Sequence, residues 1–203
     1  TNTIFLNVDT QLDFLCPAGA LYAPGAEIMA APLLLLTRHA ARHKIRILST
    51  VDPHSENDAE FAIWKPHCVV NTAGQQKLAA TKLETFSIVT SEPDLRLADA
   101  DLAAPQIIIE KQQLDCFSNP HLRPLLERFG AHHYVVYGLV TEYCVQCAAF
   151  GLLQLPSRPK VTLVSDAIQS LDPLAGQATL SEFTARGGQL ASTASLVSEL
   201  TSC

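Results

Sequence analysis

Residues 132–154 read HHYVVYGLVTEYCVQCAAFGLLQ, and in this stretch the chain passes directly from a strand into a helix. The apolar run Tyr134–Tyr137 is typical of a strand buried on both faces, and Gly138 follows it. Six residues later, Cys144 stands near the start of a predicted amphipathic helix. The partial positive charge of a helix N-terminus stabilises a thiolate, and a nearby cation would lower the pKa of the thiol further. Cys144 is therefore predicted to be a reactive nucleophile.

The alternation of strands and helices continues in both directions from this stretch. Strands are predicted over residues 3–8, 44–51, 85–90, 106–110, 134–138 and 160–165, and helices over residues 26–43, 119–129 and 174–186, with a short strand and a helix at the end of the chain. Asn119 and Pro120 are expected to be the cap and the first-turn residue of the second helix. This order predicts an α/β fold, a single-domain three-layer α/β/α sandwich over residues 1–203 with a mainly parallel sheet.

The composition limits the class of protein. A chain of 203 residues fits one domain, and a hydrophobic content of 48% suits a sheet covered on both faces. A net charge of −6 argues against nucleic acid or an anionic membrane as the main partner. Apolar runs are too short for a transmembrane helix, and no signal peptide is expected before a strand predicted to begin almost at Thr1. Six cysteines suit the core and catalysis of a protein in the reducing cytoplasm, which is the expected location.

Four residues that carry chemistry follow predicted strands: Asp9, Asp52, Lys111 and Cys144. The carboxyl ends of parallel strands meet at one edge of the sheet, where ligands bind in such folds. Asp9 could take the proton of the thiol, and the ammonium of Lys111 would favour the thiolate. Taken singly, Asp9 could be a loop or capping aspartate and Lys111 a surface lysine. Together with Cys144 they form a coherent set for covalent hydrolysis.

Residues 52–84 form an irregular segment that contains the ligand types of a metal site. Asp52 and His54 stand side by side in Asp-x-His, and Glu60 and His67 can close around the same ion. Carboxylate and imidazole suit Zn²⁺, Mn²⁺ or Fe²⁺, and a set without thiolates argues against a purely structural zinc site. Cys68 precedes an apolar pair and is interpreted as packing. The alternative for this cluster is a polar loop with hydrogen-bonded histidines.

Two aromatic residues near these groups have two interpretations each. Trp64 is the one tryptophan of the chain and lies in the irregular segment, and Phe14 follows the first strand. A flat aromatic ring beside a metal could stack on a planar ligand. The alternative is that each ring covers the core.

The motifs resemble those of the isochorismatase-like cysteine hydrolases. The stretch VDTQLDF at residues 8–14 resembles the first-strand motif of this family, Glu110-Lys111 its lysine strand, and GLVTEYCV at residues 138–145 its nucleophile motif. The Asp-x-His pair and the stretch WKPHCVVNTAG at residues 64–74 narrow the resemblance to the nicotinamidase branch, because isochorismatases proper lack this metal loop.

The resemblance implies a role for each matching residue. Asp9, Lys111 and Cys144 would form a catalytic triad, and Asp52, His54 and His67 would bind one divalent metal ion, zinc before manganese or iron. Glu60 stands where many nicotinamidases have a third histidine and is expected to bind the ion or to hold a metal-bound water. A cis Leu139–Val140 peptide would turn the Val140 N–H towards that of Cys144 and form the oxyanion hole. The expected substrate contacts are Phe14, Trp64 and Tyr143.

The function implied by the resemblance is hydrolysis of nicotinamide, a small-molecule amide, to nicotinate and ammonia through a thioester. One alternative is a related amidase that acts on an N-carbamoyl or ureido compound. Another is a non-catalytic metal or redox module that uses the Cys-x-x-Cys spacing of Cys144 and Cys147. The redox interpretation leaves Asp9 and Lys111 unexplained, so Cys147 is assigned to the core. The apolar residues 148–155 could serve a homo-oligomer contact as well as the core.

Overall fold

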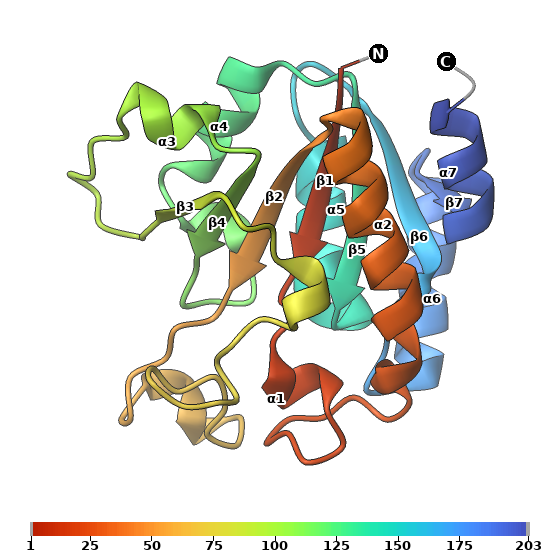
Figure 1. Cartoon of the computed structure of the whole chain (residues 1–203). Coiled ribbons are helices and arrows are strands. Elements are labelled where there is room, and N and C mark those ends of the chain that lie inside the picture. The colour runs from red at the N-terminus through yellow and green to blue at the C-terminus, as the bar shows by residue number, and fades with distance from the viewer. Residues whose placement is uncertain (1, 202–203) are drawn as a thin grey trace.

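A parallel sheet forms the centre of the molecule in the computed structural model, which describes residues 2–201 (Figure 1). Within these residues it has seven strands in the order β3-β4-β2-β1-β5-β6-β7. The predicted α/β/α sandwich is confirmed. The strands are β1 (Thr3–Val8), β2 (Arg46–Val51), β3 (Phe86–Val89), β4 (Gln106–Glu110), β5 (His133–Leu139), β6 (Lys160–Gln169) and β7 (Gln189–Ala191).

Helices cover both faces of the sheet (Figure 1). One face carries α2 (Ala30–His43) and α7 (Thr193–Thr201), and the other carries α3 (Asp99–Ala103), α4 (Leu122–Phe129), α5 (Gln146–Leu153) and α6 (Pro173–Ala185). The remaining elements are short: α1 (Leu12–Leu15), the 3₁₀ turns η1 (Ala26–Met29), η2 (Ala59–Ala62), η3 (Ala79–Thr81) and η4 (Cys116–Ser118), and the π-helical turn η5 (Thr141–Val145).

The core lies in two layers, one on each face of the sheet. Successive side chains of a strand point to opposite faces, so Leu6 of β1 packs in the layer under α4 and α5, whereas Phe5 packs against Tyr137 in the layer under α2. Strands buried on both faces carry mostly apolar residues on both faces, which explains the nearly continuous apolar runs of the sequence. Ala148 and Leu152 of α5 are fully buried in the first layer, so the apolar segment 148–155 contributes to the core.

Asn119 does not cap a helix, and this prediction is wrong. The helix α4 begins at Leu122, and the buried Asn119 instead ties two strand ends together. Its Nδ2 donates hydrogen bonds to the carbonyls of Glu110 (2.8 Å) and Thr90 (3.1 Å), and its Oδ1 accepts one from the His121 N–H (2.8 Å). The side chain therefore fixes the end of β4, next to Lys111.

Gly138 permits the close approach of β5 and β1. Its φ is +127°, and a β-carbon at this position would lie 1.9 Å from the carbonyl oxygen of Val8. Only glycine adopts this conformation without a clash. Asp9, which follows β1, and the segment Leu139–Cys144, which follows Gly138, are held next to each other as a result.

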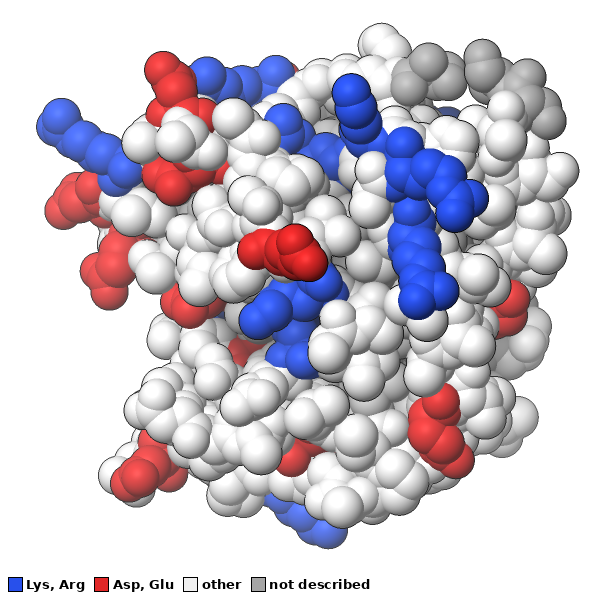
Figure 2. All heavy atoms as spheres, in the orientation of Figure 1, with Lys and Arg blue, Asp and Glu red and all other residues white. Residues whose placement is uncertain are grey.

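Neither a membrane-spanning helix nor an even distribution of charge is found among the described residues (Figure 2). None of the helices in residues 2–201 combines the length and the apolar composition that crossing a membrane requires. On the face seen in Figure 2, uncharged surface predominates and basic side chains gather over α2. Arg38, Arg42 and Lys44 are exposed at the C-terminal end of this helix. The net negative charge of the chain is therefore not spread evenly over its surface.

His133 makes the stability of the fold depend on pH. It begins β5, is buried, and its Nε2 lies 2.9 Å from the Thr162 hydroxyl oxygen. Burial, and secondarily the nearby Lys160, lowers the pKa of His133 to about 4. In the unfolded chain a histidine titrates near 6.5, so between these two values the unfolded state binds more protons and stability falls as the pH falls. We expect protonation linked to this residue to lower the free energy of unfolding by about 3 kcal/mol as the pH falls from 7 to 4.

Urea denaturation of the wild type and His133→Gln at pH 7, 5.5 and 4.5 measures this contribution. The variant should lose stability less steeply below pH 6.5 than the wild type. The exposed neighbour provides a matched control, because His132→Gln should retain the wild-type dependence. Identical pH dependence in wild type and His133→Gln would refute the assignment.

Candidate active site

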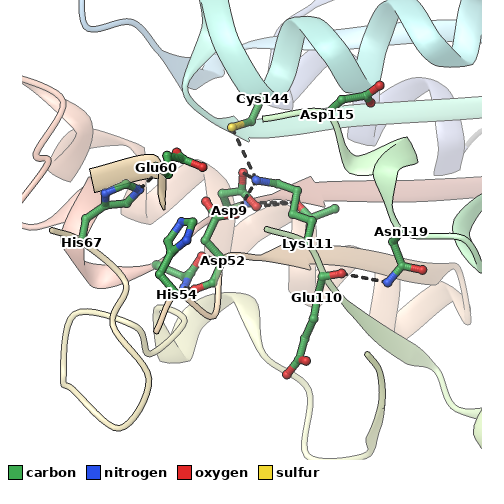
Figure 3. Close-up of polar contacts among 12 residues, drawn as sticks. Asp9, Asp52, His54, Glu60, His67, Glu110, Lys111, Asp115, Asn119 and Cys144 are labelled. Carbon is green, nitrogen blue, oxygen red and sulfur yellow. Dashed lines mark hydrogen bonds and ion pairs between the residues drawn. The ribbon is translucent and has the colours of Figure 1, made fainter. Parts of the chain in front are cut away.

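Four adjacent strands bring the predicted chemical groups to one edge of the sheet. Asp9 follows β1, Asp52 follows β2, Lys111 follows β4, and Cys144 lies in η5 after β5. The strand order β4-β2-β1-β5 makes these four strands consecutive neighbours. All four side chains are buried, and Figure 3 shows Asp9, Asp52 and Cys144 gathered around the end of Lys111.

The ammonium of Lys111 is the centre of this cluster. Its Nζ forms ion pairs with Asp52 Oδ1 at 2.6 Å and Asp9 Oδ2 at 2.9 Å, and it lies 3.6 Å from Cys144 Sγ. The sequence predicts that Lys111 lies beside the Cys144 thiol, and it predicts Asp52 only as a metal ligand. In the structure Asp52 belongs to both groups, so the lysine has two carboxylate partners.

Asp9 is held in place by the neighbouring strand β2. Its φ is +44°, in the left-handed region that aspartate tolerates better than most residues. Its N–H donates to the Thr50 carbonyl (3.3 Å), and its Oδ1 accepts a hydrogen bond from the Thr50 hydroxyl (2.6 Å). The other carboxylate oxygen is left for Lys111 and the thiol.

Burial of the Cys144 thiol opposes its ionisation. Burial raises its pKa well above the ordinary value, Lys111 opposes this rise, and Asp9 and Asp52 add to it. This is opposite to the lowered pKa predicted from the helix start, because desolvation of the buried thiol is the largest effect on its pKa. Burial also disfavours the charge of Lys111, but its two carboxylate partners outweigh that effect and raise its pKa well above the usual value. Cys144 therefore needs a base to become a nucleophile, and Asp9 lies beside it.

Asp52, His54 and His67 form a cluster of potential metal ligands. One ligand atom from each lies within 4.8 Å of the others, and all three residues are buried. His67 donates from Nδ1 to the Lys65 carbonyl when that nitrogen is protonated (2.7 Å), which leaves Nε2 free as a ligand. Burial lowers the pKa of His67 and favours the neutral ring that binds metals.

The geometry of His54 fits a metal ligand best. Its Nδ1 lies 3.1 Å from a carboxylate oxygen of Asp58, an arrangement that orients ligating histidines in many metal sites. Its Nε2 is fully buried and has no hydrogen-bond partner within residues 2–201. A buried nitrogen without a partner is unfavourable unless something absent from the chain binds it. One carboxylate and two imidazoles suit Zn²⁺, Mn²⁺ or Fe²⁺.

Glu60 lies beside the three-residue cluster and does not belong to it. The Glu60 side chain lines the pocket described next. Its Oε1 is 3.9 Å from His67 Nε2 (Figure 3). This separation suits a contact through water at least as well as a direct bond to an ion.

A small, mainly apolar pocket opens above the thiol and the cluster. Phe14, Trp64 and Tyr143, the three expected substrate contacts, all line it. The Trp64 and Tyr143 rings meet edge to face, 5.1 Å apart, and the Phe14 ring lies 5.3 Å from that of His67. Sequence reasoning missed three further wall residues. The complete lining is Phe14, Leu21, Asp52, Glu60, Trp64, His67, Leu114, Val140, Tyr143, Cys144 and Leu171.

The turn that carries the thiol has the expected backbone. The Leu139–Val140 peptide is cis, as the resemblance implies. The Val140 carbonyl accepts hydrogen bonds from the N–H groups of Tyr143 and Val145, both 3.1 Å. Val140 and Cys144, the two predicted oxyanion-hole residues, both line the pocket.

Comparison with known proteins identifies the family. The model of the isochorismatase domain matches residues 3–195. The chain belongs to the isochorismatase family. It is 24% identical over 185 residues to the nicotinamidase of Saccharomyces cerevisiae (strain ATCC 204508 / S288c), an alignment that covers 77% of this chain and 83% of the relative.

Solved structures of this family have the same fold. The pyrazinamidase of Pyrococcus horikoshii in complex with zinc is 25% identical with a TM-score of 0.76, covering 95% of this chain and 99% of that one. PnC1 from L. infantum in complex with nicotinate is 25% identical with a TM-score of 0.72, covering 96% of this chain and 94% of that one. These relatives support the assignment of the chain to the nicotinamidase branch of the family. Family membership and the relatives together indicate that the protein is an amidohydrolase.

Sequence reasoning on this family member gave no role to several residues that support its site. Gln11 clamps the backbone of Asp52, because its Nε2 donates to the Asp52 carbonyl (2.9 Å) and its Oε1 accepts from the Asp52 N–H (2.8 Å). Asp13 accepts from the N–H of Cys68 (2.7 Å), which fixes the segment next to His67. Both lie in the stretch VDTQLDF at residues 8–14, and the signal available in the sequence was a cluster of polar residues directly after a predicted strand. No sequence pattern indicated that Asp58 would contact His54 or that Thr50 would contact Asp9.

Proposed function

We propose that this amidohydrolase is a nicotinamidase that converts nicotinamide to nicotinate and ammonia through a thioester on Cys144. One observation supports this most strongly. Cys144 of the Asp9–Lys111–Cys144 cluster, and Asp52 and His67 of the potential metal-binding cluster, line one small apolar pocket with aromatic walls. A flat heteroaromatic amide fits this combination, since its ring suits the aromatic walls and its amide carbon would face the thiol.

In the proposed mechanism, Asp9 accepts the proton of the Cys144 thiol while Lys111 stabilises the thiolate. The sulfur attacks the amide carbon, and the N–H groups of Val140 and Cys144 stabilise the oxyanion, each contributing about 3 kcal/mol. Asp9 returns the proton to the departing nitrogen, ammonia leaves, and a thioester remains. Water then attacks the thioester while Asp9 accepts its proton, nicotinate is released, and the thiol is restored.

Asp52, His54 and His67 would hold one divalent ion, with Glu60 bound directly or through water. Such an ion would anchor and polarise the pyridine nitrogen of the substrate, and zinc is our first choice over manganese or iron. The aromatic side chains Phe14, Trp64 and Tyr143 would orient the ring.

An ammonia-release assay distinguishes the candidate activities. Nicotinamide and pyrazinamide should be hydrolysed, and N-carbamoyl and ureido compounds should not. Release from the carbamoyl compounds alone would instead indicate the related amidase. Disulfide formation by the purified protein, without release from any amide, would indicate the redox module.

We also propose that the enzyme works as a thiol enzyme in the reducing cytoplasm. The cysteines of residues 2–201 are free thiols, among them Cys144 and the half-buried Cys147, and the mechanism requires Cys144 to be reduced. Ammonia release should therefore persist in excess reductant, whereas a redox module would lose its oxidised form.

Removing the metal should reduce activity and stability together. Protein treated with a chelator and then dialysed should hydrolyse subsaturating nicotinamide at least about tenfold more slowly, because the ring loses its anchor. Its melting temperature should fall too, since an ion that binds only the native state stabilises that state. Metal analysis of the same samples, before and after adding back Zn²⁺, Mn²⁺ or Fe²⁺, checks both effects.

Two substitutions test the assigned ligands in the same experiment. His54→Ala should contain little metal, and Asp58→Asn should bind it about tenfold to a hundredfold more weakly because the ring of His54 is less firmly oriented. Exposed His132→Gln should match the wild type. Full activity in chelated protein that analysis shows to be metal-free would remove the ion from the proposed function.

A further inference from the structure

Glu142 links the nucleophile turn to a distant segment of the chain. It lies in η5, two residues before Cys144. One of its carboxylate oxygens, Oε1, accepts hydrogen bonds from two consecutive backbone N–H groups, those of Leu171 (2.9 Å) and Asp172 (2.7 Å). These donors are about thirty residues away in the sequence, so the two bonds cross between separate elements.

The segment held by Glu142 contributes a wall of the pocket. It runs from the end of β6 at Gln169 to the start of α6 at Pro173. Leu171 lines the pocket together with Tyr143 and Cys144. The next residue, Asp172, caps α6 by accepting from the N–H groups of Leu174 (2.8 Å) and Ala175 (3.4 Å). Glu142 therefore hydrogen-bonds the backbone of a residue in the pocket wall.

The carboxylate of Glu142 has no other strong partner. Within residues 2–201 no lysine or arginine forms an ion pair with it, and its second oxygen is buried without a hydrogen-bond partner. Hydrogen bonds to a carboxylate are stronger than those between neutral groups. A half-buried side chain that keeps one oxygen unpaired while the other accepts two N–H groups is suited to holding the segment 170–172 in place.

We propose that Glu142 is a positioning residue for substrate selection: it fixes Leu171 against the nucleophile turn so that the pocket accepts only small flat amides. This inference rests on the proposed function for its kinetic consequences. Glu142 touches none of Asp9, Lys111 or Cys144 through its hydrogen bonds, so it should affect substrate binding more than the chemical steps.

Kinetics and amide hydrogen exchange of Glu142→Ala and Glu142→Gln test the proposal. Glu142→Ala should accelerate exchange at Leu171 and Asp172 by at least about tenfold, and raise KM for nicotinamide by about tenfold with kcat within about threefold of the wild type. Glu142→Ala should also lower the ratio of kcat/KM for nicotinamide to kcat/KM for bulkier ring-substituted amides. Glu142→Gln retains an acceptor oxygen and should restore both properties nearly to wild-type values. If Glu142 acted instead through its negative charge near the start of α6, Glu142→Gln would not restore these properties, because glutamine is neutral.

Two further variants control for general loosening of the fold. Asp166→Ala removes a carboxylate oxygen that accepts from the N–H and the hydroxyl of Thr193 (2.7 and 2.9 Å), away from the pocket. It should accelerate exchange at Thr193 and leave KM unchanged. Leu171→Ala removes the wall without breaking the two hydrogen bonds, so it should raise KM while exchange at the backbone of residues 171 and 172 stays slow.

The possible results separate this proposal from the proposed function. Unchanged exchange in Glu142→Ala, equal damage from Gln and Ala, or a lower kcat with unchanged KM would each overturn the role of Glu142. If the wild type does not hydrolyse nicotinamide, the proposed function fails, and the exchange measurements alone then decide whether Glu142 holds the segment.

Discussion

Cys144→Ala should lower the turnover of nicotinamide by on the order of 10⁴-fold or more, because it removes the sulfur that forms the thioester. The thiol is the one sulfur within reach of the Lys111 ammonium in the described site, 3.6 Å from its nitrogen. Alanine removes one buried atom and leaves the ion pairs of Lys111 with Asp9 and Asp52 in place. The fold should therefore persist, which circular dichroism and a melting curve would verify alongside the ammonia assay.

Cys147→Ala is the matched control for this substitution. Cys147 lies about one helical turn beyond Cys144 and is half-buried. Its loss should leave turnover within about threefold of the wild type, because it belongs to neither cluster of the site. Rapid acid quenching followed by intact-mass measurement should detect the acylated wild type and no adduct on Cys144→Ala. A Cys144→Ala enzyme that keeps more than about one hundredth of wild-type turnover would contradict the covalent mechanism.

Lys111→Met should destabilise the fold by about 3–5 kcal/mol and abolish measurable turnover, because it leaves two buried carboxylates without their counter-charge. Lys111 is fully buried, and Asp9 and Asp52 are nearly so. Both carboxylates contact its Nζ within 2.9 Å. The same substitution removes the cation that stabilises the thiolate. Urea denaturation measures the first effect and ammonia release the second.

A double substitution separates the structural and chemical parts of this effect. In Lys111→Met with Asp9→Asn, one of the two uncompensated charges is gone, so part of the lost stability should return. Activity should not return, since the proton acceptor of the thiol is missing as well. Lys160→Met provides a surface comparison: its pair with Glu199 (2.9 Å) is partly exposed, so its loss should cost less than about 1 kcal/mol. Equal costs for Lys111→Met and Lys160→Met would show that burial of the lysine does not matter.

Local patterns predicted the elements of the fold well and some of their ends poorly. The apolar runs at residues 3–8 and 106–110 coincide with β1 and β4. The helix start at Asn119 was wrong, because the Asn119 side chain binds carbonyls of two other strands in place of its own helix. A capping residue and a residue that ties strands together have the same local sequence signal, since both offer a short polar side chain before a helix.

In the site, too, local sequence predicted the residue types but not all of their contacts. The position of Asp9, Asp52, Lys111 and Cys144 after their strands predicted that they meet, because parallel strands align their carboxyl ends. The sequence also indicated the ligand types at Asp52, His54 and His67. It did not indicate Asp58 behind His54, whose role depends on where the ring turns within a folded loop.

The sequence by itself determined the parallel sheet, the edge at which the site lies and the chemical groups present there. These depend on periodicity and on residue type, which are properties of short stretches of chain. Only the tertiary structure decided that Lys111 is shared by two aspartates and that Glu142 holds the wall at Leu171. It also reversed the predicted direction of the Cys144 pKa. Contacts and burial depend on how segments far apart in the chain pack together. Burial in turn determines how far the pKa of each titratable group shifts.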